Sequence, residues 1–138
     1  TEGMFCLLDA DKFKSINDNF GHEVGDKVIK AIANCLKNAF RNSDITLRLG
    51  GDEFAAYAVG VTNEVQGRIA INRLFAMIEE INIPELGDRK ITISLGAAFF
   101  KSNSGETFTE LYKRADSAAY ISKKTVGNCF TFAEVEKI

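Results

Sequence analysis

Hydrophobic residues change their spacing along the chain, and each change predicts a different element. Residues 4–8 form an unbroken apolar run, which is typical of a central strand covered on both faces. The polar stretch over residues 11–20 indicates a loop or a short helical turn. Apolar residues recur every three or four positions over 22–40 and again over 63–81, so the sequence predicts two long amphipathic helices.

The remaining patterns complete a sheet. Two apolar runs within 45–59 flank a glycine pair and predict a β-hairpin. Alternation over 90–100 predicts a strand, and the short run 129–132 predicts another. Between them a capping-box pattern opens a third helix over 107–124, with Phe108 expected to face inward. The order β, α, hairpin, α, β, α, β predicts an α/β fold of the α+β sandwich type, with a central mixed sheet of about five strands surrounded by helices.

Composition favours one domain over residues 1–138. With 46% hydrophobic residues, the chain can bury a real core. Its formal net charge of −2 argues against a surface for long nucleic acids, whose phosphates require basic partners. No apolar run is long enough to span a bilayer, and the three cysteines lack metal-type spacing, which indicates a cytoplasmic domain with buried, reduced thiols. Because the sequence opens with Thr1 rather than Met, we expect a fragment of a longer protein.

Acidic residues form the first candidate site. Asp9 and Asp11 follow the first strand, where open α/β sheets place ligands, and Asp52 and Glu53 follow the glycines of the hairpin tip. Carboxylates beside bare backbone can hold a hard cation against phosphate oxygens, although an ordinary polar turn uses the same residues. If the first strand and the hairpin are neighbours, Asp9, Asp52 and Glu53 meet with no Lys or Arg between them. Such carboxylates repel one another unless divalent cations bind, so the sequence indicates magnesium-dependent chemistry on a nucleoside triphosphate.

Five other polar residues each have two interpretations. Asn17 and Asp26 lie near the start of a long helix, where they either cap it or accept from the donor edge of guanine. Arg41 and Asp44 form either a polar turn or a contact to a purine nucleotide, since guanidinium pairs bidentately with guanine or phosphate. Lys123 is either an ordinary cation at a helix end or a partner of a triphosphate. Spacing alone leaves these alternatives open.

Taken together, the motifs resemble those of a GGDEF domain, the catalytic domain of diguanylate cyclases, over nearly the whole chain. The signature Gly50-Gly51-Asp52-Glu53-Phe54 is unaltered, and Arg48 precedes it. The other matching segments are Asp9–Asp18, Gly21-His22, Gly25-Asp26, Ile93–Gly96, Arg114–Asp116 and Tyr120–Lys123. The resemblance implies the fold of nucleotidyl cyclases and polymerase palms, with the signature at the tip of the hairpin.

The resemblance also implies a reaction. Two GTP molecules would condense to cyclic di-GMP and release two pyrophosphates, with one GTP held by each domain of a homodimer. Mg²⁺ or Mn²⁺ would be the cofactor. An upstream sensor or membrane domain would control the enzyme in the full-length protein, this domain would lie in the cytoplasm, and nucleic acid would not be a partner.

The family's functional residues carry over by position. Asp52 would assist deprotonation of the attacking 3′-hydroxyl, with Glu53 as the second catalytic residue. The implied metal ligands are Asp9, Asp52, Glu53 and the backbone carbonyl of Ala10. The implied GTP-binding residues are Asn17 and Asp26 at the guanine, Phe13, Lys14 and Lys123 near the phosphates, and Gly50 and Gly51 at the tip. Arg41 and Asp44 match an Arg-x-x-Asp inhibitory site, where cyclic di-GMP would restrain the enzyme.

Departures from the family keep more than one function open. The family often has a phosphate-binding arginine where this chain has Gly127, so a contact is lost or Lys124 replaces it. Arg73 is only a near match to the arginine that completes the inhibitory site from a second helix. An active cyclase is one hypothesis, and a regulatory module that binds GTP or cyclic di-GMP without catalysis is the alternative. An enzyme for a different nucleotide is a third, and Asn17 and Asp26 argue against it.

Overall fold

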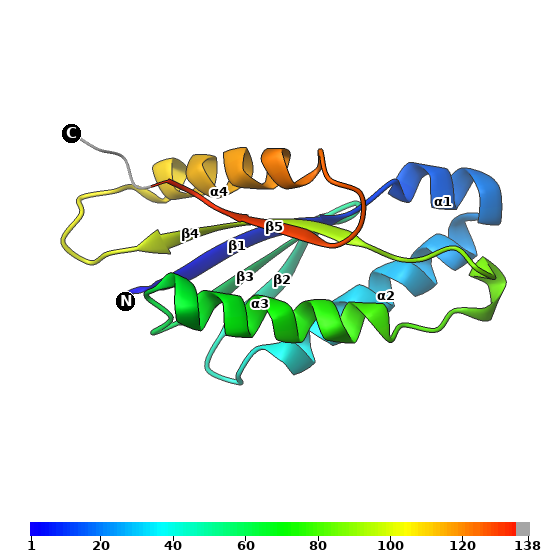
Figure 1. Ribbon diagram of the computed structural model, residues 1–138, viewed down its shortest axis with the longest axis horizontal. Helices are drawn as coiled ribbons and strands as arrows, with labels where there is room; N and C mark the ends of the chain where they lie inside the picture. Colours follow the sequence, from blue (N-terminus) through cyan, green and yellow to red (C-terminus); the bar gives the residue numbers. More distant parts are fainter. Residues whose placement is uncertain (135–138) are drawn as a thin grey trace.

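Five strands form one mixed sheet, and helices cover both of its faces (Figure 1). This computed structural model describes residues 1–134. The strands are β1 (Gly3–Ala10), β2 (Ile45–Gly50), β3 (Glu53–Val59), β4 (Ile93–Phe100) and β5 (Cys129–Phe132). The helices are α1 (Phe13–Phe20), α2 (His22–Ala39), α3 (Glu64–Glu79) and α4 (Phe108–Ser122), with a short 3₁₀ helix η1 over Pro84–Leu86. The predicted α+β architecture is confirmed.

The central strand is β1, as its unbroken apolar run predicts. The strand order is β2-β3-β1-β4-β5, with β1 antiparallel to both neighbours and β5 parallel to β4. Leu8 lies opposite Phe54 of β3 on one side and Leu95 of β4 on the other. The carboxyl end of β1 therefore lies beside the tip of the β2–β3 hairpin, at one edge of the sheet.

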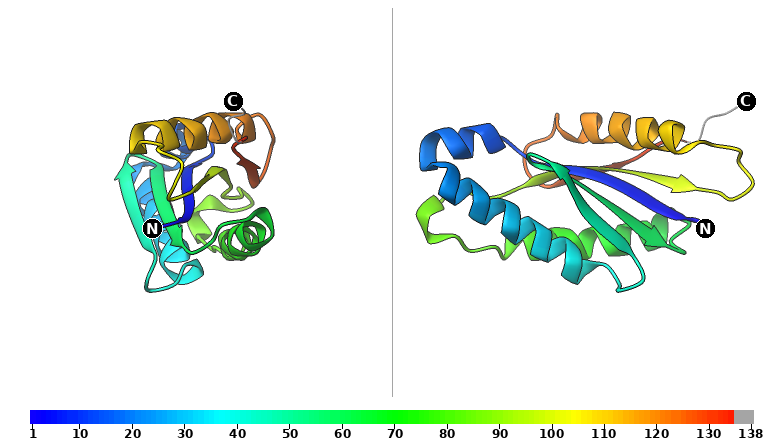
Figure 2. Two further views of the ribbon diagram at one scale, coloured as in Figure 1. Left: turned by 90° about the vertical axis from the view of Figure 1, so that its left-hand side faces the viewer. Right: turned by 180° about the vertical axis from the view of Figure 1, so that it is seen from behind.

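Helix α4 covers one face of the sheet, and α2 and α3 cover the other, as both views of Figure 2 show. Since side chains alternate along a strand, β1 supplies both layers. Met4, Cys6 and Leu8 pack with α2 and α3, whereas Phe5 and Leu7 pack with α4. None of the helices described within residues 1–134 has the length and apolarity needed to cross a membrane.

Two segments differ in how well the sequence predicts them. Of the two alternatives for the polar segment, a loop or a short helical turn, residues 13–20 form a short helix, α1, because Ile16 anchors this segment in the core. Phe108, which we expected to face inward, is 66% exposed. It is the first residue of α4, and its ring meets Phe5 edge-on with 5.5 Å between the ring centroids.

The three cysteines differ in burial. Cys6 on β1 and Cys35 on α2 are buried as expected, and burial raises the pKa of Cys6 to about 12. Cys129 is only partly buried because it begins the edge strand β5, where one side of the sheet ends. All three thiols are free.

Candidate functional site

The end of β1 and the start of β3 bring the predicted acids together. Asp9 lies opposite Glu53 in the register of the two strands. The Ala10 N–H donates to the Asp52 carbonyl oxygen at 3.2 Å, so the hairpin tip is tied directly to the end of β1. Acids from distant parts of the sequence therefore meet at one edge of the sheet.

The Asp9 carboxylate is only partly satisfied at this edge. Its Oδ2 pairs with Lys123 Nζ at 2.9 Å, while its Oδ1 is buried and has no hydrogen-bond partner among residues 1–134. Burial raises the pKa of Asp9 above its ordinary value, and the nearby Lys123 only partly opposes this effect. The expectation that no Lys or Arg lies among the acids is wrong, because the C-terminal end of α4 brings Lys123 to Asp9.

Glu53 is held by a residue that the sequence reading missed. The Tyr112 hydroxyl on α4 donates to Glu53 Oε1 at 2.9 Å, and this carboxylate raises the pKa of Tyr112. Within the described part of the chain, no three His, Cys, Asp or Glu residues are gathered into a ready group of metal ligands. The oxygens at the edge belong to Asp9, Asp52 and the Ala10 backbone on the cavity wall, with one Asp9 oxygen unsatisfied, and to Glu53 opposite Asp9 in the strand register. Such an all-oxygen set fits Mg²⁺, which takes few protein ligands besides phosphate and water.

Asp11 has a structural role at the same edge. Its two carboxylate oxygens accept from Thr92 Oγ1 at 2.6 Å and Ser94 Oγ at 2.5 Å. Thr92 immediately precedes β4, and Ser94 lies within it and is fully buried. Asp11 therefore fastens the loop after β1 to β4, whereas Asp9 pairs with Lys123 and keeps one oxygen without a partner among the described residues.

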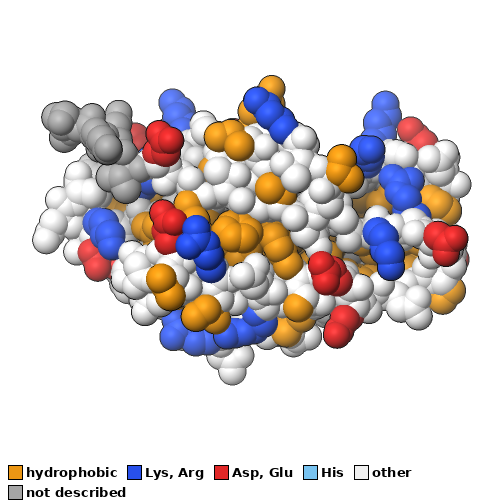
Figure 3. Space-filling view, in the orientation of Figure 1, with side chains coloured by type: hydrophobic (Ala, Val, Ile, Leu, Met, Phe, Trp, Pro, Cys, Tyr) orange, Lys and Arg blue, Asp and Glu red, His pale blue; other side chains and the backbone are white. Residues whose placement is uncertain are grey.

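A cavity of about 720 Å³ opens beside these acids. Its wall includes Asp9, Ala10 and Asp52, together with Lys123 from the end of α4. The other lining residues are Asp11, Lys12, Phe13, Lys14, Arg89, Lys90, Thr92, Thr125, Val126 and Gly127. Figure 3 shows Lys and Arg side chains gathered on the part of the surface where α1 lies. Of the predicted metal ligands, Asp9, Ala10 and Asp52 therefore share one cavity with the predicted phosphate residues Phe13, Lys14 and Lys123, while Glu53 lies outside its described lining.

The backbone around this cavity has unusual conformations. Lys12, just before α1, has φ of 54°, the left-handed region that residues other than glycine rarely adopt. At the hairpin tip Gly50 and Gly51 have φ of 145° and 53°. Arg48 donates to the Gly51 carbonyl at 2.6 and 2.9 Å and so holds the tip in place. The two glycines lie at the tip itself, outside the described lining of the cavity.

Asn17 of α1 and Asp26 of α2 both lie near the corner between these two helices. A Cβ at Gly25 would overlap the side-chain oxygen of Asn17, so glycine at this position lets Asn17 pack against the start of α2. Asp26 is the next residue and is exposed. Asn17 therefore lies against the residue that precedes Asp26, and both predicted guanine contacts lie beyond the described lining of the 720 Å³ cavity.

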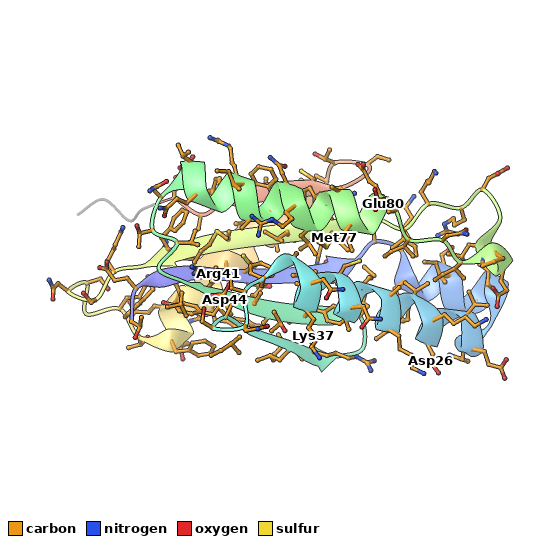
Figure 4. The ribbon with its side chains drawn as sticks, turned by 90° about the horizontal axis from the view of Figure 1, so that it is seen from below. Asp26, Lys37, Arg41, Asp44, Met77 and Glu80 are labelled. Atoms are coloured by element: carbon orange, nitrogen blue, oxygen red, sulfur yellow. The ribbon has the colours of Figure 1, made fainter. Side chains whose placement is uncertain are left out.

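The Arg41–Asp44 turn forms a second charged cluster, at the other end of α2 from Asp26 (Figure 4). The Asp44 side chain is 3% exposed, and its oxygens accept from the Arg41 and Val59 N–H groups, each at 2.9 Å. The Arg41 side chain is 60% exposed, donates to the Val59 carbonyl and lies 3.5 Å from Asp44. Arg73 of α3 donates to the Ala39 carbonyl at 3.1 Å, and it lines a 260 Å³ cavity together with Arg41 and Asp44.

No cationic side chain stands at position 127, where the family often has an arginine. Gly127 lines the main cavity with φ of 93°, and a Cβ there would meet open space. Lys124, whose replacement of this arginine was one of two alternatives, places its Nζ 5.1 Å from the ring centroid of Tyr120. Lys124 is also absent from the described lining of the cavity, so this contact turns it toward α4 instead.

The fold and the acidic edge define a domain of the nucleotidyl cyclase and polymerase palm class. More specifically, the chain belongs to the GGDEF family, because the family model described as "Diguanylate cyclase, GGDEF domain" matches residues 1–129. The chain is similar to the GGDEF domain of PA1120 (YfiN or TpbB) from Pseudomonas aeruginosa, with a TM-score of 0.86, 29% identity, and coverage of 98% of this chain and 84% of that chain. It is also similar to the GGDEF domain of DgcB from Caulobacter crescentus, solved in complex with c-di-GMP, with a TM-score of 0.85, 29% identity, and coverage of 98% and 80%.

Curated relatives are much longer than this chain. Diguanylate cyclase DgcP from Pseudomonas aeruginosa is 38% identical over 122 residues, which are 88% of this chain and 18% of that protein. Probable diguanylate cyclase DgcT from Escherichia coli (strain K12) is 35% identical over 128 residues, which are 88% of this chain and 27% of that protein. The chain therefore spans about a fifth to a quarter of these relatives.

Proposed function

We propose that this domain is a diguanylate cyclase, which condenses two GTP molecules to cyclic di-GMP and two pyrophosphates. The observation that carries the proposal is the meeting of Asp9 and Asp52 at the wall of a cavity that also contains Lys123. Membership of the GGDEF family supports the choice of GTP and of this product. Because the product contains two identical halves, a homodimer with one GTP in each domain is the arrangement that we propose.

Asp9, Asp52, Glu53 and the Ala10 carbonyl would hold Mg²⁺ or Mn²⁺, which when bound supplies positive charge that acidifies the 3′-hydroxyl and offsets charge on the leaving pyrophosphate. The unsatisfied Asp9 Oδ1 supports this assignment, because a buried carboxylate oxygen is costly without a donor or a cation. Asp52 would accept the hydroxyl proton. Tyr112 would keep the Glu53 carboxylate in position through its hydrogen bond.

The remaining residues would bind and orient the nucleotide. Lys123, which now pairs with Asp9 at 2.9 Å, can also pair with a phosphate oxygen in the same cavity. Phe13 and Lys14 lie in the first turn of α1, where backbone N–H groups lack helical partners and favour anions. Asp26 would accept hydrogen bonds from the N1–H and N2–H₂ groups of guanine, and the Asn17 amide would add a further contact at the α1–α2 corner.

We assign product inhibition to the Arg41–Asp44 turn. Arg41 and Arg73 line one cavity, so two guanidinium groups are available to a phosphate or a guanine of cyclic di-GMP. Asp44 would contribute mainly by holding the turn, because its carboxylate is buried and already accepts two backbone hydrogen bonds. Binding there would oppose turnover through a coupling between two sites.

In the full-length protein, the other domains of the chain would set how fast two GGDEF domains form a dimer. The long relatives support the presence of an upstream sensor or membrane domain, with the GGDEF domain on the cytoplasmic side. The isolated domain would then depend on its own concentration to form the dimer.

Incubation with GTP and Mg²⁺, followed by chromatography of the nucleotides, tests the proposal. We expect cyclic di-GMP, with turnover per domain rising as the protein concentration rises, because two domains must meet. Asp52→Ala should abolish the product, whereas Lys113→Gln, an exposed change on α4, should leave it unchanged. Concentrated protein that binds GTP but makes no product would instead support the regulatory module, which the missing cation at Gly127 favours.

A further inference from the structure

We propose that Arg89 binds the phosphates of the nucleotide. It would replace the phosphate-binding arginine that the family often has at position 127, where this chain has no side chain. This inference rests on the proposed function, since it assigns a further binding residue to the same cavity. Arg89 lies between η1 and β4, in a segment for which the sequence analysis assigned no functional residue.

The first observation is that Arg89 is partly buried and unpaired. Its side chain lines the 720 Å³ cavity and an adjoining cavity of about 540 Å³, so it lies on the wall between them. Within residues 1–134, its guanidinium takes part in no hydrogen bond or ion pair. Its backbone N–H donates to the Leu86 carbonyl at 3.0 Å, which fixes the residue in the turn after η1. A partly buried guanidinium without a partner favours the arrival of an anion.

The second observation is the charge of the cavity wall. Five cations line it, against three carboxylates: Lys12, Lys14, Arg89, Lys90 and Lys123 against Asp9, Asp11 and Asp52. Two of the carboxylates are already engaged, Asp11 by hydroxyl groups and Asp9 by Lys123. A positive excess in a chain whose net charge is −2 suits a polyanion such as a triphosphate.

The third observation is the position of Arg89 relative to Gly127. Both residues line both cavities, so a phosphate that lies near Gly127 lies within the same space as Arg89. Lys124 contacts Tyr120 instead, and Lys90 is exposed and remains hydrated. Arg89 is therefore the cation best placed to replace the family's arginine, and its planar group can pair bidentately with phosphate.

The test measures binding without turnover. The α,β-methylene analogue of GTP, with Mg²⁺, and GMP are titrated separately into the wild-type chain and its variants by calorimetry. Arg89→Gln should lower the affinity for the analogue about 10-fold or more, because hydrogen bonds to charged groups are strong. The same substitution should leave the affinity for GMP nearly unchanged, because GMP lacks the two outer phosphates. Arg89→Lys should recover part of the loss, and Lys113→Gln should have no effect on either ligand.

The outcomes separate this inference from the proposed function. If the wild type binds the analogue and Arg89→Gln binds it equally well, Arg89 has no phosphate role although the site stands. If Arg89→Gln lowers the affinities for GMP and the analogue by the same factor, Arg89 contacts the nucleoside instead of the outer phosphates. If the substitution clearly lowers the melting temperature, Arg89 stabilises the fold instead. If the wild type binds neither ligand, the proposed function fails and this inference fails with it.

Discussion

Two clusters of charged residues lie in different parts of this domain, and their hydrogen bonding differs sharply. At the edge of the sheet, Asp9 keeps one buried oxygen without a partner and Arg89 has no ion pair among the described residues. In the Arg41–Asp44 turn, Asp44 is more deeply buried, yet its oxygens accept two backbone hydrogen bonds. Since buried polar groups are normally satisfied, the unsatisfied groups mark the cluster that awaits a ligand, and the satisfied carboxylate stabilises the fold.

Asp9→Asn should produce the largest effect, on turnover. Removing the negative charge should lower the rate of cyclic di-GMP formation by at least about 10²-fold, since electrostatic groups at a reacting centre contribute on this scale. Stability should change by less than about 0.5 kcal/mol, because burial already disfavours the Asp9 charge and the released Lys123 is 47% exposed. Chromatographic rates and urea denaturation measure the two quantities. Full turnover in a folded Asp9→Asn protein would remove the metal site from this edge.

The same substitution in the second cluster should have the opposite result. Asp44→Asn replaces an acceptor of the Arg41 and Val59 N–H groups by an amide, whose NH₂ cannot accept. We expect a loss of about 1–3 kcal/mol in unfolding free energy, because a buried donor loses its charged partner. Urea denaturation checks this value. An unchanged midpoint would mean that the turn does not depend on its carboxylate, and the contrast with Asp9 would collapse.

A smaller effect tests the guanine contacts. Gly25→Ala would place a methyl group on the Asn17 side-chain oxygen, a flexible group that can move aside. The fold should tolerate the change, while GTP affinity should fall about 10-fold through the displaced amide, as for the loss of one strong hydrogen bond. Calorimetry with GTP and with ATP separates guanine recognition from phosphate binding. Asn17→Ala should give a similar loss, and the double variant should be no worse than either single one.

The sequence predicts the frame of the acidic edge but misses its supporting contacts. An apolar run ending at Asp9 and a glycine-tipped hairpin ending in acids follow from local patterns, and pairing of the two strands then brings the acids together. The Tyr112–Glu53 and Lys123–Asp9 contacts depend on where α4 crosses the sheet. No local spacing encodes that crossing. Small residues on β4 were the only available signal, since Gly96 admits the α4 backbone so closely that a Cβ would overlap it.

Asp11 and Arg89 illustrate the same limit. The polar side chains of Thr92 and Ser94 fit the alternation of a strand, and nothing in their sequence positions assigns them to Asp11, about 80 residues earlier. Likewise, a basic pair before a strand normally indicates a solvated turn. Only the fold shows that Arg89 is partly buried on the cavity wall without an ion pair among the described residues, unlike its exposed neighbour Lys90.

Arg41→Ala should have the smallest effect on the folded protein. The side chain is 60% exposed, so its pairing with Asp44 is screened, and the Arg41 N–H that Asp44 accepts remains in the variant. We therefore expect less than about 1 kcal/mol loss of stability and an unchanged initial rate with GTP. Inhibition by added cyclic di-GMP should nevertheless disappear, because this guanidinium is the more accessible cation of its cavity. Arg68→Ala, on the exposed face of α3 and paired with Glu64, is the matched control and should keep inhibition. If both variants remain inhibited equally, the product acts at the nucleotide cavity itself, and the second cluster has only a structural role.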